Sequence, residues 1–208
     1  MDTQSNKESR LDQFTKNPRK ALWSLAIPML IGMSVQNIYQ IVDMIFVGRL
    51  GPDAIAALAF NLPLLFFAIG IIFGLGSGVT AVIAQFIGMK SKQKADNAAE
   101  HSILLGLVLS AIFSLTGWLY GRDLLLILGT PENILDDAFN YFIILVSGIV
   151  FMVLSVFFRS ILSGEGDNKF PMYVLGAGTL LNIILDPIFI FWLDMGVQGA
   201  AVATIISQ

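Results

Sequence analysis

The stretch Leu-Leu-Asn-Ile-Ile-Leu-Asp-Pro-Ile-Phe-Ile-Phe, residues 180–191, places a carboxylate directly before a proline inside an apolar run. A second carboxylate, Asp43, lies in a similar setting in the first apolar segment of the chain. Inserting a carboxylate at the centre of a membrane helix costs about 2.5–3.5 kcal/mol on the translocon scale. Because no lysine or arginine lies in the middle of an apolar segment to offset this cost, Asp43 and Asp186 indicate a functional site.

The composition places the chain in a membrane. Of its 208 residues, 56% are hydrophobic and 13% are charged, whereas soluble domains carry roughly 25% charged residues. The apolar residues form blocks of the length, about 20 residues, that a helix needs to cross a bilayer core of about 30 Å. The absence of cysteine excludes disulfides and thiolate metal sites. No cleavable signal peptide is expected, because a polar N-terminus precedes an apolar run too long for a signal core.

The apolar blocks predict an all-α, polytopic bundle of about six transmembrane helices. Five of them are expected at residues 21–47, 54–87, 98–120, 138–158 and 170–193. A sixth apolar helix begins at Val197 and is truncated, because the sequence given stops about 12 residues later. We therefore expect an N-terminal segment over residues 1–20 and one transmembrane lobe over residues 21–208.

The distribution of lysine and arginine predicts the orientation of the bundle. With these spans, ten of the twelve basic residues fall on the same side as the N-terminus, and two, Arg49 and Arg122, fall on the other. Short cytoplasmic loops carry the excess of basic residues in membrane proteins. The N-terminus is therefore expected in the cytoplasm, and the protein is expected to be a multi-pass protein of the cell membrane.

Polar residues recur at helical spacing in two of the apolar segments. Residues three and four positions apart share a helix face. Such stripes comprise Gln36, Gln40 and Asp43, with Tyr39 beside Asp43, in the first segment, and Thr179, Asn182 and Asp186 in the fifth. Each stripe offers one carboxylate together with neutral polar groups, which suits a hard cation or a shared proton.

Two prolines predict helix bends near these stripes. Pro187 has no N–H group, so the carbonyl of Ile183 loses its helical partner and a kink is expected beside Asp186. Pro28 is expected to weaken the first apolar helix in the same way.

Other function classes find no support in the sequence. It contains no nucleophile with an adjacent base, no zinc cluster and no basic surface for nucleic acid, so neither an enzyme nor a nucleic-acid-binding protein is expected. No cofactor is expected apart from a bound cation. A non-transporting, half-size membrane protein that acts with a partner remains an alternative.

Several segments together resemble the multidrug and toxic compound extrusion (MATE) family. They are Pro28, Gln36, Tyr39 and Asp43, the turn at residues 48–51, the segment 159–167, Asn182 to Pro187, and residues 196–204. The resemblance implies a transporter of two six-helix lobes that sits in the lipid bilayer, with this chain similar to the first lobe and the C-terminal lobe missing. It also implies export of cationic or amphipathic small molecules in exchange for sodium or protons.

The resemblance further implies which residues bind the coupling ion. Asp43, Asn182, Asp186 and Thr204 match the cation site of the drug-pump branches, where sodium is a possible ligand. Gln36 and Tyr39 match positions close to that site, and Pro28 matches a bend in the first helix. Because a central cleft needs two lobes, we expect these 208 residues to be a fragment of a longer protein or to receive their second half from another chain. A lipid-linked oligosaccharide flippase of the same superfamily is the alternative within membrane transport.

Overall fold

The computed structural model describes residues 18–208, apart from a few side chains of the first helix, among them those of Gln36 and Tyr39. Every regular element in this described part is helical. In order along the chain the elements are α2 (Pro18–Gly48), α3 (Pro52–Gly88), α4 (Lys92–Ile127), α5 (Glu132–Ser147), α6 (Ile149–Gly164), α7 (Lys169–Pro187), the π-helix η1 (Ile188–Trp192) and α8 (Val197–Ile206). The predicted helical bundle is confirmed, with helices that extend several residues beyond the predicted apolar limits.

The turns between helices use residues suited to them. Gly129 has a φ of +83° after α4, and the next N–H, that of Thr130, donates to the carbonyl of Leu125 at 3.1 Å. This left-handed glycine and the wide hydrogen bond across it are a common way to end a helix. At the start of α3, Pro52 occupies the first helical turn, where its missing N–H costs nothing.

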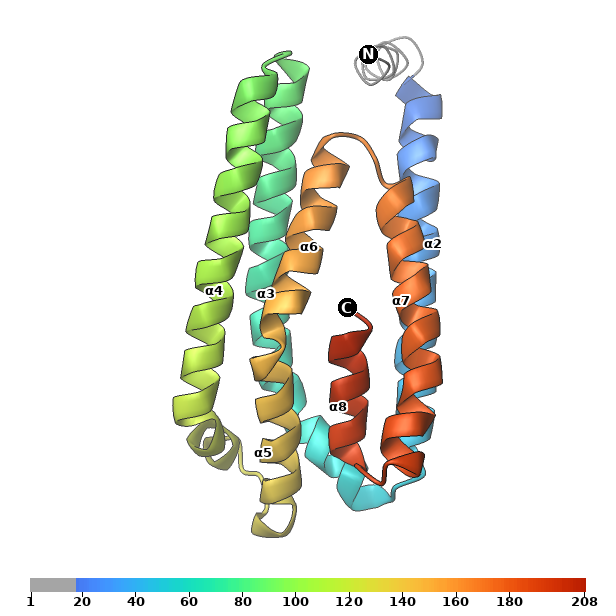
Figure 1. The fold of residues 1–208 in the computed structure, drawn as a ribbon, viewed down its shortest axis with the longest axis vertical. Coiled ribbons are helices and arrows are strands. Elements are labelled where there is room, and N and C mark those ends of the chain that lie inside the picture. The colour runs from blue at the N-terminus through green and yellow to red at the C-terminus, as the bar shows by residue number, and fades with distance from the viewer. Residues whose placement is uncertain (1–17) are drawn as a thin grey trace.

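The helices form two groups that α8 connects (Figure 1). Helices α3, α4, α5 and α6 pack against one another, and α2 packs along α7. Helix α8 lies between the groups and contacts α5 on one side and α7 and η1 on the other. The first and fifth apolar segments of the sequence therefore lie side by side.

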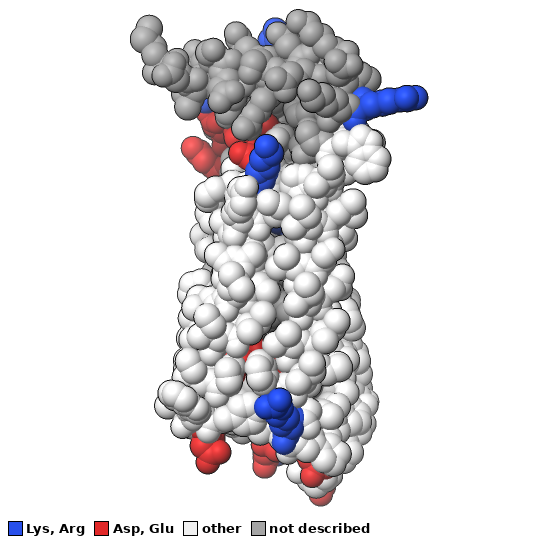
Figure 2. All heavy atoms as spheres, turned by 90° about the vertical axis from the view of Figure 1, so that its right-hand side faces the viewer, with Lys and Arg blue, Asp and Glu red and all other residues white. Residues whose placement is uncertain are grey.

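The outer surface suits a bilayer. Figure 2 shows charged side chains gathered at the two ends of the molecule, with a nearly uncharged belt between them. Among the described residues, four helices are long and apolar enough to cross a membrane, or five if α5 and α6 count as one bent span. Helix α8 is a shorter apolar helix. The exact number of spans thus depends on how the bent pair and α8 are counted.

Close contacts at glycines hold the larger group together. A β-carbon at Gly106 of α4 would lie 2.7 Å from the ring of Phe157, and one at Gly121 would lie 2.7 Å from the ring of Phe142. Phe157 is fully buried. Small residues at such positions let membrane helices approach closely, which replaces the hydrophobic driving force that is absent between helices in lipid.

The predicted span over residues 138–158 is not one straight helix. Helices α5 and α6 meet at Gly148 with a bend of 47°. A β-carbon at Gly148 would overlap the side chain of Ile205 in α8. The break therefore lies where another helix approaches the backbone, a contact that a hydropathy pattern does not reveal.

Helical structure continues through both prolines. Helix α2 continues through Pro28. At Pro187 the α-helix changes to the π-helix η1, in which Leu193 N donates to the carbonyl of Ile188 at 2.9 Å. Helix α7 and η1 together form one apolar segment of 24 residues. A wider helical turn thus follows Pro187, and the bends at the two prolines stay predictions.

Candidate cation-binding site

The polar stripe of the fifth apolar segment lies on the buried face of α7. Thr179 is 8% exposed, Asn182 is 1% exposed and Asp186 is fully buried. The prediction that these three residues share one helix face is confirmed. Asp186 is an ionisable residue without access to solvent. Other groups in the lobe must therefore provide the hydrogen bonds and the compensating charge that water and its ions provide to an exposed carboxylate.

The polar atoms of Asp186 and Asn182 are only partly satisfied by hydrogen bonds. The amide Nδ2 of Asn182 donates a hydrogen bond of 3.1 Å to Oδ1 of Asp186. The other carboxylate oxygen, Oδ2, and the amide oxygen of Asn182 are buried and have no hydrogen-bond partner in the described part of the chain. Buried polar atoms without a partner cost free energy, and each one in a folded protein calls for an explanation such as a bound ion.

Asp43 brings a second carboxylate to this region. It is partly buried on α2, and its Oδ1 is also buried without a partner among the described residues. Because α2 packs along α7, the charges of Asp43 and Asp186 are close enough to interact. Two carboxylates that repel each other in a low-dielectric environment favour a cation or a proton between them.

The remaining predicted site residues have different positions. Gln40 is exposed on α2, whereas Asp43 is partly buried, and its place beside Asp43 in the polar stripe stays a prediction. The side chains of Gln36 and Tyr39 lie outside the described residues. Thr204 is partly buried on α8, and its carbonyl accepts a hydrogen bond of 2.9 Å from Ser207.

The donor set suits a hard cation. Among the described residues, no group of three or more His, Cys, Asp or Glu side chains could hold a metal ion. The unpaired atoms at Asp43, Asn182 and Asp186 are all oxygens. Oxygen ligands of this kind bind sodium-like or magnesium-like ions rather than soft transition metals.

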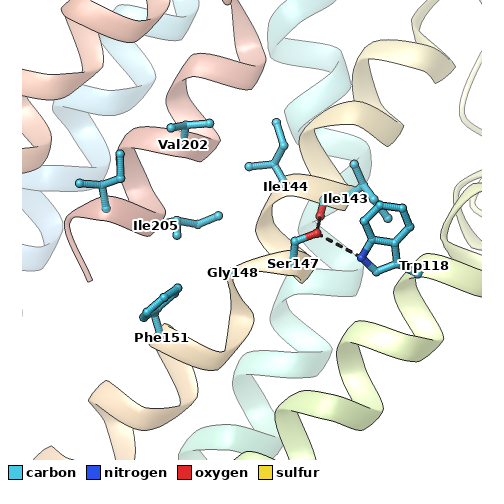
Figure 3. A pocket seen from close by; sticks show the side chains of 9 residues that line it. Trp118, Ile143, Ile144, Ser147, Gly148, Phe151, Val202 and Ile205 are labelled. Carbon is cyan, nitrogen blue, oxygen red and sulfur yellow. Dashed lines mark hydrogen bonds between the residues drawn. The ribbon is translucent and has the colours of Figure 1, made fainter.

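A groove of about 510 Å³ at the break between α5 and α6 was not indicated by the sequence analysis (Figure 3). It is lined by Trp118, Ile143, Ile144, Ser147, Gly148, Phe151, Val202, Ile205 and Ile206. Its polar feature is a hydrogen bond of 3.1 Å from the indole N–H of Trp118 to the hydroxyl of Ser147. The adjacent Ser147-Gly148 pair in an apolar run is a signal that could have predicted the break.

Comparison with known proteins places the chain in a family. The model of the MatE family matches residues 28–188. The chain belongs to the MatE family. Members of this family are transporters rather than enzymes, and the apolar helices of this chain are those of a multi-pass membrane protein.

Several known MatE proteins are similar over most of this chain. A probable multidrug resistance protein of Bacillus subtilis, YoeA, is 33% identical over 92% of this chain and 43% of its own length. A protein of Shewanella oneidensis named as an FAD transporter is 29% identical over 90% of this chain and 42% of its own length. A solved structure described as the outward-facing conformation of a multidrug resistance MATE family transporter has 40% identity and a TM-score of 0.88, over 91% of this chain and 42% of that one.

The chain therefore spans less than half the length of the MatE relatives it matches. The coverage agrees with the resemblance to a first lobe.

Proposed function

We propose that this chain provides the coupling-ion site of a cation-driven antiporter that exports organic cations or other amphipathic drugs. The observation that supports it most directly is the set of three buried, unpaired oxygens at Asp43, Asn182 and Asp186. They lie in the interior of an apolar membrane bundle, where a functional role is the default explanation for an ionisable residue.

The coupling ion in this proposal is sodium or a proton. Either one would relieve the repulsion between Asp43 and Asp186 and would satisfy oxygens that otherwise lack a partner. Thr204, which the family resemblance assigns to the site, would add a further oxygen. Because the carboxylates come from α2 and α7, ion binding would stabilise the contact between these two helices.

This contact gives the ion a way to influence drug binding. An ion changes a conformational equilibrium by as much as its affinities for the two conformations differ. Occupancy that draws α2 toward α7 would favour one arrangement of the lobe, and loss of the ion would favour another. Exchange of the drug against the ion follows if the drug prefers the arrangement without the ion.

The proposed orientation has the N-terminus in the cytoplasm. Lys90, between α3 and α4, and Lys169, at the start of α7, lie toward the end of the bundle where α2 begins, and Arg49, after α2, and Arg122, near the end of α4, lie toward the other end (Figure 1). Since these 208 residues contain no cysteine, Lys92→Cys and Asp136→Cys each add one thiol to this part of the protein. A membrane-impermeant thiol reagent should label Lys92→Cys only from the cytoplasm and Asp136→Cys only from outside. Labelling of Asp136→Cys from the cytoplasm would contradict the orientation.

The test of the function is export of a fluorescent organic cation from cells that express the full-length protein. Asp43→Asn and Asp186→Asn should each reduce export to near background, because each removes a charged ligand. Asp136→Asn is the matched control, since the carboxylate of Asp136 lies at the surface in an ion pair with Arg122. Normal export by both site variants would show that the proposed site is wrong.

Sodium and protons can be separated in the same assay. With vesicles held at one pH on both sides, an imposed sodium gradient should drive uptake of the drug if sodium is the coupling ion. A pH gradient in sodium-free buffer should drive it if the coupling ion is a proton. If neither gradient drives transport, the antiport mechanism is wrong whatever the substrate.

A second candidate substrate class is large aromatic anions. The guanidinium of Arg159, the one charged group in α6, lies 5.1 Å from the ring centroid of Phe73 in α3. A cation stacked on an aromatic ring could bind a phosphate and an aromatic ring system together, and one relative is named as an FAD transporter. Competition of FAD with the fluorescent cation, lost in Arg159→Gln, would favour this class.

A further inference from the structure

The break between α5 and α6 is a built feature with its own hydrogen bonds. A helix that is interrupted inside a membrane must satisfy the backbone groups it releases. The hydroxyl of Ser114 in α4 donates to the carbonyl of Val146 at 2.7 Å, and that of Ser147 donates to the carbonyl of Ile143 at 2.6 Å. Trp118, one turn after Ser114, donates to Ser147 at 3.1 Å. Helix α4 therefore stabilises the last turn of α5 at the bend (Figure 3).

The end of α8 rests directly on this bend. The side chain of Ile205 occupies the space that a β-carbon at Gly148 would need. A displacement of α8 would therefore press on the bend or release it.

The other side of α8 rests on the helix that carries Asp186. A β-carbon at Gly199 would lie 2.6 Å from the carbonyl carbon of Phe189 in η1. One at Gly178 in α7 would overlap the carbonyl oxygen of Ser207. Between these contacts, the alanines at positions 200, 201 and 203 are almost completely buried. Packing this close leaves no room for α7 and α8 to move independently.

We propose that α8 transmits the state of the carboxylate pair to the bend between α5 and α6, with Ile205 as the positioning residue. Neutralising Asp186, as a bound cation or proton would, shifts α7 relative to α2. Helix α8 moves with α7 because of the close contacts at their glycines, and this movement changes the packing of Ile205 against Gly148. The physiological meaning of this link rests on the proposed coupling-ion site, whereas the link itself is a property of the packing.

Trp118 is a natural reporter of the bend, because its indole N–H is hydrogen-bonded to the hydroxyl of Ser147 and its side chain is exposed. The experiment uses the full-length protein with every tryptophan except Trp118 replaced by phenylalanine. Trp118 emission is compared in four forms: this parent, Asp186→Asn, Ile205→Ala, and the double variant. Asp186→Asn removes the negative charge of the carboxylate, as binding of either a sodium ion or a proton would. The four forms make a double-mutant cycle, which isolates the interaction between the two positions.

We expect Asp186→Asn to shift the emission maximum of Trp118 in the parent and to cause less than half of that shift when Ile205 is alanine. Ile127→Ala, at an exposed isoleucine at the end of α4, is the matched control and should leave the shift intact. An Asp186→Asn shift of equal size with and without Ile205 would overturn the proposal, as would no shift at all. If Ile205→Ala fails to elute as a single species on size exclusion, Ile205→Val replaces it with an intermediate expected loss.

The two proposals fail separately. If the cycle shows coupling while Asp43→Asn and Asp186→Asn export normally, the packing link stands and the coupling-ion site is wrong. If export requires both carboxylates while the effects on Trp118 are additive, the site stands and the role of α8 is wrong. Hydrogen exchange of the amides at residues 144–151 gives a second measurement, and it should rise in Asp186→Asn but not in the double variant.

Discussion

Asn182 and Asp186 are joined by a hydrogen bond of 3.1 Å between the amide nitrogen and one carboxylate oxygen, one helical turn apart on the buried face of α7. This bond fixes the orientation of both side chains. The other carboxylate oxygen of Asp186 and the amide oxygen of Asn182 have no hydrogen-bond partner among the described residues, so both are available to a ligand.

The first prediction concerns this pair. Asn182→Leu keeps the side-chain size but removes the donor to Asp186 and one candidate ligand. Hydrogen bonds to charged groups contribute about 1.5–3 kcal/mol, so the ion concentration for half-maximal export should rise roughly tenfold or more. Asn37→Leu, at an exposed position on α2, should leave this concentration unchanged. An unchanged value in Asn182→Leu would remove Asn182 from the site.

The second prediction separates stability from ion binding. Asn61 is fully buried in α3, and its amide donates to the carbonyls of Ala57 at 2.8 Å and Ala138 at 3.0 Å, which ties α3 to α5. Asn61→Ala should lower stability by about 1–3 kcal/mol and should leave the ion dependence of export intact in the protein that remains folded. Thermal melting in detergent measures the first effect, with exposed Asn133→Ala as control. A shift in ion dependence would mean that Asn61 acts on the site.

The third prediction compares two glycines. At Gly106 a β-carbon would meet the buried ring of Phe157 at 2.7 Å, whereas at Gly78 in α3 it would meet nothing within 4 Å. Gly106→Ala should therefore destabilise the protein by about 1–3 kcal/mol through overpacking. Gly78→Ala should be neutral or slightly stabilising, because alanine is the better helix former. Equal melting temperatures for the two variants would mean that α4 and α6 pack less closely than described.

The fourth prediction tests whether α2 and α7 must move apart during transport. A β-carbon at Gly32 would lie 3.4 Å from the side chain of Leu175. With cysteines at these two positions, a short, reducible bifunctional thiol reagent should link α2 to α7 and block export, and reduction should restore it. The single-cysteine variants treated in the same way are the controls. Full export by the linked protein would show that this contact persists through the transport cycle.

The sequence was a good guide to features that depend on local pattern. The start of α8 at Val197 is as predicted, and the spacing of Thr179, Asn182 and Asp186 predicted their shared face because helical periodicity is a local property. The proximity of Asp43 and Asp186 was a hypothesis about tertiary structure, and the packing of α2 along α7 brings them together. Their role as ion ligands stays a prediction.

Features set by contacts between helices could not be predicted in this way. The Ser147-Gly148 pair is a local signal for a bend, but the contact of Ile205 with Gly148 is tertiary and has no signal in the sequence. Gln40 has the right spacing for the polar stripe of α2 but is exposed, because the burial of each residue on α2 depends on which helices pack against it. At Pro187, the change to a π-helix depends on the wide hydrogen bonds available in η1 rather than on proline alone.

The placement of the two carboxylates on the first and the fifth apolar segments has a consequence for biosynthesis. Asp43 enters the membrane when α2 is made, but the helix that carries its partner is completed only after most of the chain has followed. At about 5–20 residues per second, this delay is on the order of ten seconds. During that time α2 carries a carboxylate whose partner helix has not yet been made, at an insertion cost of about 2.5–3.5 kcal/mol.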